Sequence, residues 1–355
     1  MDLEKIVKLE ESINVLKNKK SRIYFLVQDT KGNPRAGVKH IYDIAFSLFD
    51  NGYNSIIIHE TNDYKGVSEW LDEKYMKIPH QAIEGQNLAL SPEDIVVIPE
   101  LYGHVMDQLK NYPCGKIVLC QSYDYMLETL PPGANWQQYG FMKCITTSEE
   151  QKNYILNIMK SASVDVLPPV LSEHFSKKDK PAKPIIAIHT REPRDTAKII
   201  KSFYLKYPQY RWITFRDMRG IKQEDFAKFL KESYLSVWVD VESGFGTFPL
   251  ESMVSGTPVI GKIPNMKPEW MNEKNGIWTH EFNEIIDIVA NFTQNWLEDN
   301  IKEDLYSDMD NSSKKYTDNK LFTNEVVSTF DSYLTIRLES FTEQLDKLKI
   351  TEVEK

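Results

Sequence analysis

The sequence predicts an α/β protein with two domains, each built on a doubly wound parallel sheet. Three observations lead to this prediction. Short apolar runs alternate with helical stretches, which is typical of βα units whose strands are buried on both faces. The alternation stops in a polar, proline-containing segment near the middle of the chain and then restarts. The length of 355 residues also exceeds what one hydrophobic core usually supports.

The first half of the chain begins with a helix and continues through a series of strands. Apolar residues recur every three or four positions over 2–20, which predicts an amphipathic helix. Further helices are predicted over 38–52 and 148–162. The predicted strands are RIYFLVQ (22–28), SIIIHE (55–60), DIVVIPE (94–100), KIVLCQ (116–121) and KCITTS (143–148).

The second half repeats this rhythm after a segment rich in proline and lysine. Its predicted strands are PIIAIHT (184–190), RWITFR (211–216), LSVWVDV (235–241) and TPVIG (257–261). We therefore place the first domain at 1–172, a linker at 173–184, the second domain at 185–325 and a C-terminal helix at 326–355.

The C-terminal helix carries an apolar stripe with heptad spacing over 328–350. We expect this stripe to pack on the protein's own surface. The alternatives are pairing with the helix at 2–20 or with a second subunit, so a homodimer through the terminal helices is possible.

Composition narrows the class of protein and its compartment. The net charge of −9 argues against a protein that coats nucleic acid, although it leaves room for a local basic groove. Three cysteines in apolar surroundings predict buried free thiols in a reducing compartment. No apolar run approaches the ~20 residues of a membrane-spanning helix, and the acidic start does not resemble a signal peptide. We expect a cytoplasmic protein.

The stretch ESGFGTFPLESMVSGTPVIG (242–261) carries the strongest functional signal. Gly244 and Gly246 allow a turn whose backbone can approach a ligand closely. Pro249 suits the first turn of a following helix, and the amides at that helix start would face an anion. On the same first turns, the Glu251 carboxylate can accept hydrogen bonds from two vicinal hydroxyls, such as those of a ribose.

The order GFG, LESM, SG and TPVIG resembles the signature of retaining GT-B glycosyltransferases, above all glycosyltransferase family 4. The resemblance implies two Rossmann-like domains facing across a cleft, with C-terminal helices that cross back to the first domain. In that family two glutamates eight positions apart contact the donor. Glu251 matches the second glutamate, at the ribose. The first falls on Ser243, with Glu242 one residue earlier, so either residue would act near the transferred sugar.

The resemblance also implies how a nucleotide-diphosphate sugar, the co-substrate, is held. The family's second domain opens with a strand followed by an Arg and a Lys that clamp the diphosphate, and IAIHTREPRDTAKII (186–200) has this layout. Arg191 is the strongest choice for the catalytic cation, because it follows the strand directly. No other cofactor and no metal ion are implied. The remaining donor-binding candidates are Arg194, Lys198, Gly244, Phe245, Gly246, Thr247 and Glu251.

Acceptor-side candidates lie in the first half of the chain. The family has a glycine turn before its first long helix, and here Gly37 and Arg35 occupy that region. QSYDY (121–125) resembles the corresponding segment of a rhamnosyltransferase-like subset, which points to Gln121, Tyr123 and Asp124. The alternative is that Tyr123 merely packs in the core. His104 can touch an acceptor, but a lone histidine at a helix start is more often structural.

The resemblance thus implies a metal-independent retaining glycosyltransferase of the hexosyltransferase type, acting in glycan or polysaccharide assembly with a hydroxyl acceptor. Asp308 and Asp310 of DMD (308–310) mimic a metal-binding motif but lie in a polar segment that we expect to be solvated surface. Three alternatives remain: a GT-B protein that binds a sugar nucleotide without turnover, a hexosamine-2-epimerase-like enzyme, and a glycosyltransferase that acts on modified DNA.

Overall fold

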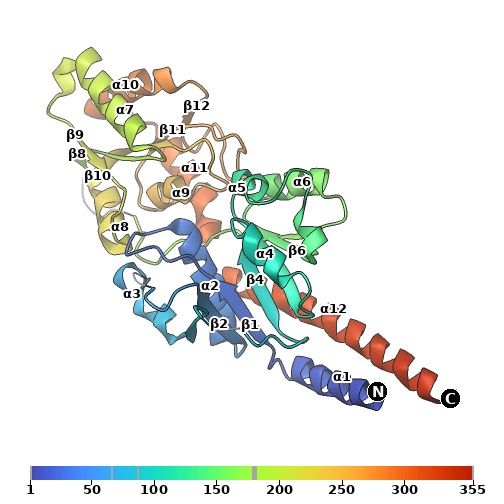
Figure 1. Ribbon diagram of the computed structural model, residues 1–355. Coiled ribbons are helices and arrows are strands. Elements are labelled where there is room, and N and C mark those ends of the chain that lie inside the picture. Colours follow the sequence, from blue (N-terminus) through green and yellow to red (C-terminus); the bar gives the residue numbers. More distant parts are fainter. Residues whose placement is uncertain (1, 65–66, 86–87, 178–181, 354–355) are drawn as a thin grey trace. The chain divides into compact units, whose positions relative to one another are not determined.

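The computed structural model describes residues 2–64, 67–85, 88–177 and 182–353, and it confirms the predicted fold class (Figure 1). These residues form one seven-stranded and one five-stranded sheet, and every recorded strand pair is parallel. Helices connect most successive strands in both sheets, as the alternating sequence pattern predicts; within the described residues, β3 to β4 and β11 to β12 are joined without one.

Contacts divide the chain into two units. Unit 1 comprises 1–146, 152–167 and 320–355, and unit 2 comprises 147–151 and 168–319. The sequence placed the end of the first domain at 172, the start of the second at 185 and its end at 325. Residues 178–181 of the proposed linker lie outside the described residues. The C-terminal helix belongs to unit 1, as the resemblance implies.

Unit 1 contains the seven-stranded sheet in the order β3-β2-β1-β4-β5-β6-β7. Strands β2 and β3 are added in turn on one side of β1, and strands β4 to β7 are then added on its other side. Its elements are α1 (Asp2–Lys17), β1 (Arg22–Leu26), α2 (Ala36–Asp50), β2 (Asn54–His59), α3 (Val67–Trp70), η1 (Glu73–Lys77), β3 (His80–Ala82), β4 (Ile95–Pro99), α4 (Gly103–Leu109), β5 (Gly115–Cys120), α5 (Tyr123–Glu128), η2 (Trp136–Tyr139), β6 (Lys143–Thr146), α6 (Glu149–Ile158), β7 (Ser163–Val166) and α12 (Asn319–Val353).

Unit 2 contains the five-stranded sheet in the order β12-β11-β10-β8-β9. Here the direction of strand addition reverses between β8 and β10. Its elements are β8 (Lys183–Thr190), α7 (Pro193–Lys206), η3 (Pro208–Tyr210), β9 (Thr214–Asp217), α8 (Gln223–Glu232), β10 (Ser233–Val239), α9 (Thr247–Val254), β11 (Val259–Lys262), β12 (Ile277–Thr279), η4 (Phe282–Glu284), α10 (Ile285–Leu297), α11 (Glu303–Ser313) and η5 (Lys314–Thr317).

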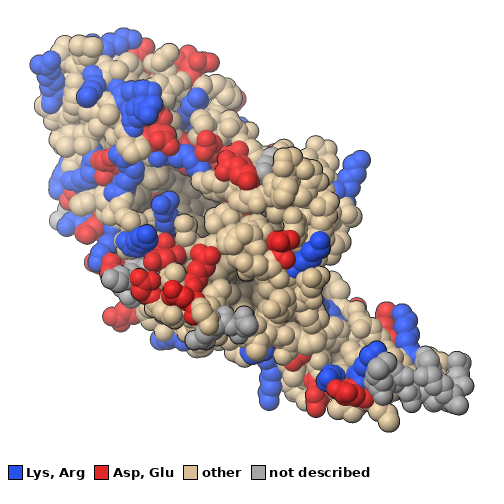
Figure 2. All heavy atoms as spheres, viewed as in Figure 1, with Lys and Arg blue, Asp and Glu red and all other residues tan. Residues whose placement is uncertain are grey.

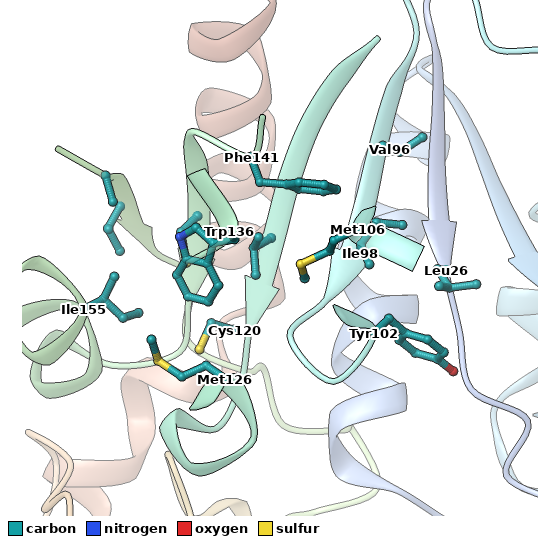
Figure 3. Close-up of a cluster of buried hydrophobic side chains, with 14 of the residues drawn as sticks. Leu26, Val96, Ile98, Tyr102, Met106, Cys120, Met126, Trp136, Phe141 and Ile155 are labelled. Atoms are coloured by element: carbon teal, nitrogen blue, oxygen red, sulfur yellow. The ribbon is translucent and has the colours of Figure 1, made fainter. Parts of the chain in front are cut away.

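The core of unit 1 fills the space between its sheet and the helices that follow the strands (Figure 3). Trp136 and Phe141 are almost fully buried, and Cys120 and Met126 lie in the same cluster. Burying a large apolar side chain of this kind stabilises the fold by roughly 1.5–3 kcal/mol. All three cysteines are buried free thiols, which confirms that prediction. Among the described residues, no helix is long and apolar enough to cross a membrane.

The long helix α12 packs its apolar stripe on unit 1. Phe330 is fully buried with its ring centroid 6.0 Å from that of Phe25 on β1, and Leu334 is 5% exposed. This confirms the expected packing on the protein's own surface. Towards its end α12 also pairs with α1, since Lys349 Nζ lies 2.7 Å from a carboxylate oxygen of Glu10. The two termini accordingly lie on neighbouring helices (Figure 1).

Several expected element limits were wrong. The strand expected over 211–216 begins at Thr214, because residues 208–213 form a 3-10 helix and a turn. The C-terminal helix begins at Asn319 rather than 326. The DMD segment is not simply solvated: it lies on α11, where Met309 is 1% exposed and Asp310 pairs with Lys177.

Candidate active site

The strand order of unit 2 points to the ends of β8 and β10. In an open parallel sheet, ligands bind outside the carboxyl ends of the strands where the direction of strand addition reverses. Thr190 pairs with Val239 at the ends of these two strands, so Arg191 and Asp240 leave the sheet side by side. The Arg191 amide also donates to the Val239 carbonyl at 3.0 Å. The predicted cation and the glycine-rich segment therefore meet at one edge of the sheet.

Arg191 lies between two carboxylates. Its Nη1 is 3.2 Å from Asp240 Oδ1, and its Nε is 2.7 Å from Glu242 Oε2. Burial raises the pKa of Asp240, and the Arg191 charge opposes that rise. Asp240 is 14% exposed whereas Glu242 is 47% exposed, so Asp240 is the more enclosed partner of the guanidinium. Glu242 thus lies beside the cation, and Ser243 follows it half-buried.

The glycine-rich loop that follows leads into α9. Gly246 caps this helix with φ at +77°, a conformation that L side chains rarely adopt. A Cβ at Gly246 would also lie 3.1 Å from the Trp238 ring and 3.2 Å from the Trp270 ring. Glycine is therefore required here for both its backbone conformation and its lack of a side chain.

The helix α9 starts with unpaired amides, as every helix does, so its first residues favour an anion. Phe245 is buried and Thr247 half-buried at this start, and Pro249 lies on the first turn as predicted. Glu251 lies one turn further along α9 and is half-buried. The loop and the helix therefore bring the predicted amides and Glu251 into one segment.

The two other predicted cations do not join this cluster. Lys198 is on the exposed side of α7, where its Nζ pairs with Asp195 Oδ1 at 3.3 Å. Arg194, in the first turn of α7, is exposed. Of the three cations proposed for the diphosphate, Arg191 alone has recorded contacts with the 240–246 loop in the described structure.

Four residues near this edge were missed by the sequence reasoning: Asp240, His189, Asp217 and Arg219. His189, at the end of β8, stacks on Phe248 of α9 with centroids 5.2 Å apart, and burial lowers its pKa to about 4. The imidazole is therefore neutral at pH 7. On β9, Asp217 accepts a 2.9 Å hydrogen bond from Arg219 Nε. Each residue lies at or just beyond a strand end, which is the signal that was available.

In unit 1 the strand order reverses between β1 and β4, and part of the acceptor-side set is brought together there. Gln121 Nε2 donates to the Gly37 carbonyl at 3.0 Å, and a Cβ on Gly37 would lie 2.2 Å from Gln121 Oε1. Gly37 is therefore needed for this close contact. Arg35 caps the start of α2 and is exposed.

The remaining acceptor-side candidates are more dispersed. The Tyr123 ring packs edge-on against Tyr154 at 5.6 Å and belongs to the rim of the core, which favours the structural interpretation of this side chain. Asp124 is half-buried beside it on α5. His104 on α4 is exposed, with Nε2 3.6 Å from a Glu60 carboxylate oxygen.

Glu100 is a buried carboxyl group that the sequence reasoning did not single out. It directly follows β4, is 3% exposed, and accepts a 2.9 Å hydrogen bond from the Ser122 amide. Burial raises its pKa to about 7. Its carbonyl accepts a bond from Thr129 Oγ1 at 2.8 Å. Glu100 therefore ties the end of β4 to the segment that carries Gln121 and Tyr123.

Comparison with known proteins identifies the fold. No family model and no curated protein matches the sequence. Sucrose-phosphate synthase from Thermosynechococcus elongatus is similar in structure, with a TM-score of 0.63 at 11% identity over 89% of this chain and 100% of that one. Anabaena HepE in complex with UDP and glucose gives a TM-score of 0.66 at 13% identity over 88% and 100%. HepE with UDP-glucose gives 0.64 at 12% identity over 88% and 99%. The chain has the GT-B fold.

Proposed function

We propose that the chain is a retaining glycosyltransferase of the hexosyltransferase type, similar to family 4, that moves a sugar from a nucleoside-diphosphate sugar to an acceptor hydroxyl. The observation that carries the proposal is Arg191 beside the glycine-rich loop, at the strand reversal of unit 2. The GT-B fold is shared with HepE, whose structures contain UDP with glucose and UDP-glucose. We place the reaction in glycan or polysaccharide assembly, in the cytoplasm, by resemblance alone.

In the proposed reaction the bond between the sugar and the diphosphate breaks while the bond to the acceptor oxygen forms on the same face of the sugar. The proton of the acceptor hydroxyl passes to a departing phosphate oxygen, as the family resemblance implies. Arg191 and the loop amides neutralise the leaving diphosphate, and Glu251 binds the ribose. Charge-assisted hydrogen bonds aimed at developing charge are an effective source of such stabilisation. In this scheme no metal ion is needed for the leaving group.

We expect a nucleoside diphosphate to raise the melting temperature of the protein. The measurement is a thermal-shift panel of UDP, GDP, ADP, CDP and dTDP, each with Mg²⁺ and with EDTA. A ligand at 100 times its Kd stabilises the folded state by about 2.7 kcal/mol. EDTA should leave the shift intact. A panel in which no nucleotide shifts the melting temperature contradicts the proposal, and a shift that requires Mg²⁺ contradicts its metal-independent form.

Binding without turnover is a second candidate, because the chain departs from the family pattern at the first glutamate. That position falls on Ser243, whereas the glutamate present here is Glu242, one residue earlier, where it contacts Arg191. Release of UDP from UDP-sugar in the presence of an acceptor separates the two functions, since only an enzyme releases it. Over unit 2, Lys and Arg side chains are interspersed with Asp and Glu on the face shown in Figure 2. This distribution gives the DNA-modifying alternative no support.

A further inference from the structure

The carbonyl groups of the glycine-rich loop are held by side chains from elsewhere in unit 2. Gln151 Nε2 donates to the Gly244 carbonyl at 3.0 Å, and Trp270 Nε1 donates to the Phe245 carbonyl at 2.8 Å. Both donors are buried: Gln151 is fully buried and Trp270 is 4% exposed. Two successive peptide groups are thus fixed in orientation by hydrogen bonds on their carbonyl side.

Fixing a carbonyl also fixes the amide of the same peptide group. In a trans peptide the C=O and N–H bonds point in opposite directions, and the described chain contains no cis peptide bond. The Gly244 carbonyl shares its peptide plane with the Phe245 amide, and the Phe245 carbonyl shares its plane with the Gly246 amide. Gln151 and Trp270 therefore turn these two N–H groups away from themselves.

The two amides have no acceptor within the part of the protein that the structure describes. Both amides are therefore able to donate hydrogen bonds to a ligand. Successive amides that point the same way form a concavity suited to an anion. Arg191 lies on the neighbouring strand end, contacting Glu242 of the same loop. The two amides and the Arg191 guanidinium are thus suited to an anion.

We infer that Gln151 and Trp270 are positioning residues for the donor diphosphate, an inference that rests on the proposed function. They touch neither substrate nor reacting atoms; they hold the Phe245 and Gly246 amides towards the phosphate oxygens before the ligand arrives. Trp270 is itself anchored, because its carbonyl accepts a 2.6 Å hydrogen bond from Asn275 Nδ2. Gln151 Nε2 also contacts Thr147 Oγ1 at 2.6 Å, within the 147–151 segment that clusters with unit 2.

The test is Trp270→Phe, which removes the indole N–H and keeps an aromatic ring against Gly246. Loss of one neutral hydrogen bond should raise the Kd for UDP by about 2- to 12-fold, measured by titration calorimetry. The second readout is the ¹⁵N–¹H spectrum, which reports on each amide separately. A merely structural role of Trp270 would not change how these two particular amides respond to UDP. UDP should shift the Phe245 and Gly246 amides strongly in the wild-type protein and less in the variant.

Trp70→Phe is the matched control, because Trp70 is also buried, at 6% exposure, and its Nε1 donates to Thr30 Oγ1 at 3.0 Å in unit 1 and not to the loop. It should leave both the Kd and the two amide shifts unchanged. The inference is overturned if the Trp270→Phe variant binds UDP as tightly as the wild type and shows the same amide shifts. It is also overturned if the two tryptophan variants weaken UDP binding equally. A wild-type protein that binds no nucleoside diphosphate removes the proposed function as well.

Discussion

Replacing Arg191 by glutamine should weaken UDP binding by about 10- to 150-fold. Hydrogen bonds that involve a charged group contribute about 1.5–3 kcal/mol each, which corresponds to this range of affinity. The effect on sugar transfer should be larger, because stabilisation of the leaving group grows as its charge develops, and removal of one such donor costs on the order of 10²–10³ in rate. Titration calorimetry and UDP release measure the two effects.

The matched control is Arg216→Gln in the same unit. The Arg216 side chain is 27% exposed against 28% for Arg191, and its Nη1 pairs with Glu232 Oε2 at 3.0 Å. The Arg216→Gln variant therefore tests whether the loss of any half-buried arginine ion pair in unit 2 weakens nucleotide binding. We expect UDP affinity close to that of the wild type. Equal weakening by the two substitutions would remove Arg191 from the donor site.

Replacing Glu242, one of the two carboxylates that contact Arg191, should affect UDP affinity in the direction opposite to replacing Arg191. The Glu242 carboxylate contacts Arg191 Nε, and a diphosphate oxygen has to compete with it. Glu242→Gln should therefore lower the Kd for UDP in calorimetry, while the same change in an Arg191→Gln background should have little effect. This double-mutant cycle isolates the contact from the general loss of one negative charge. A Glu242→Gln variant that tightens UDP equally in both backgrounds would refute competition for Arg191.

The parallel sheets were predictable because their central strands are continuous apolar runs. The short strands β3, β7 and β12 were not predicted, since His80–Ala82 and Ile277–Thr279 have three residues each and carry no such run. β3, β7 and β12 all lie at sheet edges, where one side lacks a neighbouring strand and burial imposes a weaker pattern. The strand order that locates the site also required the structure.

Arg191 and the glycine-rich loop could be found from local sequence, because each follows a recognisable strand. The residues that hold the loop could not. Gln151 is separated from Gly244 by 93 positions, and Trp270 from Phe245 by 25. Nothing in the composition around Gln151 or Trp270 distinguishes a donor to a distant carbonyl from an ordinary buried side chain. Such contacts are properties of the fold and not of a local motif.

The buried carboxyl of Glu100 should make the folded state less stable as pH rises. Its pKa is about 7 in the folded protein and 4.5 as the ordinary value, so between these pH values the folded state binds more protons than the unfolded state. The associated stability is fully present below pH 4.5 and is lost as pH rises through 7. The difference of pKa corresponds to about 3 kcal/mol between these limits. Urea unfolding at pH 5, 6, 7 and 8 measures it.

Glu100→Gln should remove this contribution, because a neutral amide oxygen can accept the Ser122 amide at every pH. The variant should differ most from the wild type at pH 8, where the wild type carries a buried charge, and the gap should narrow towards pH 5. Glu128→Gln, an exposed glutamate on α5, is the control and should keep the wild-type pH dependence. Parallel pH curves for Glu100→Gln and the wild type would show that Glu100 does not titrate between its ordinary pKa and 7. In that case burial does not keep the Glu100 carboxyl protonated at the end of β4.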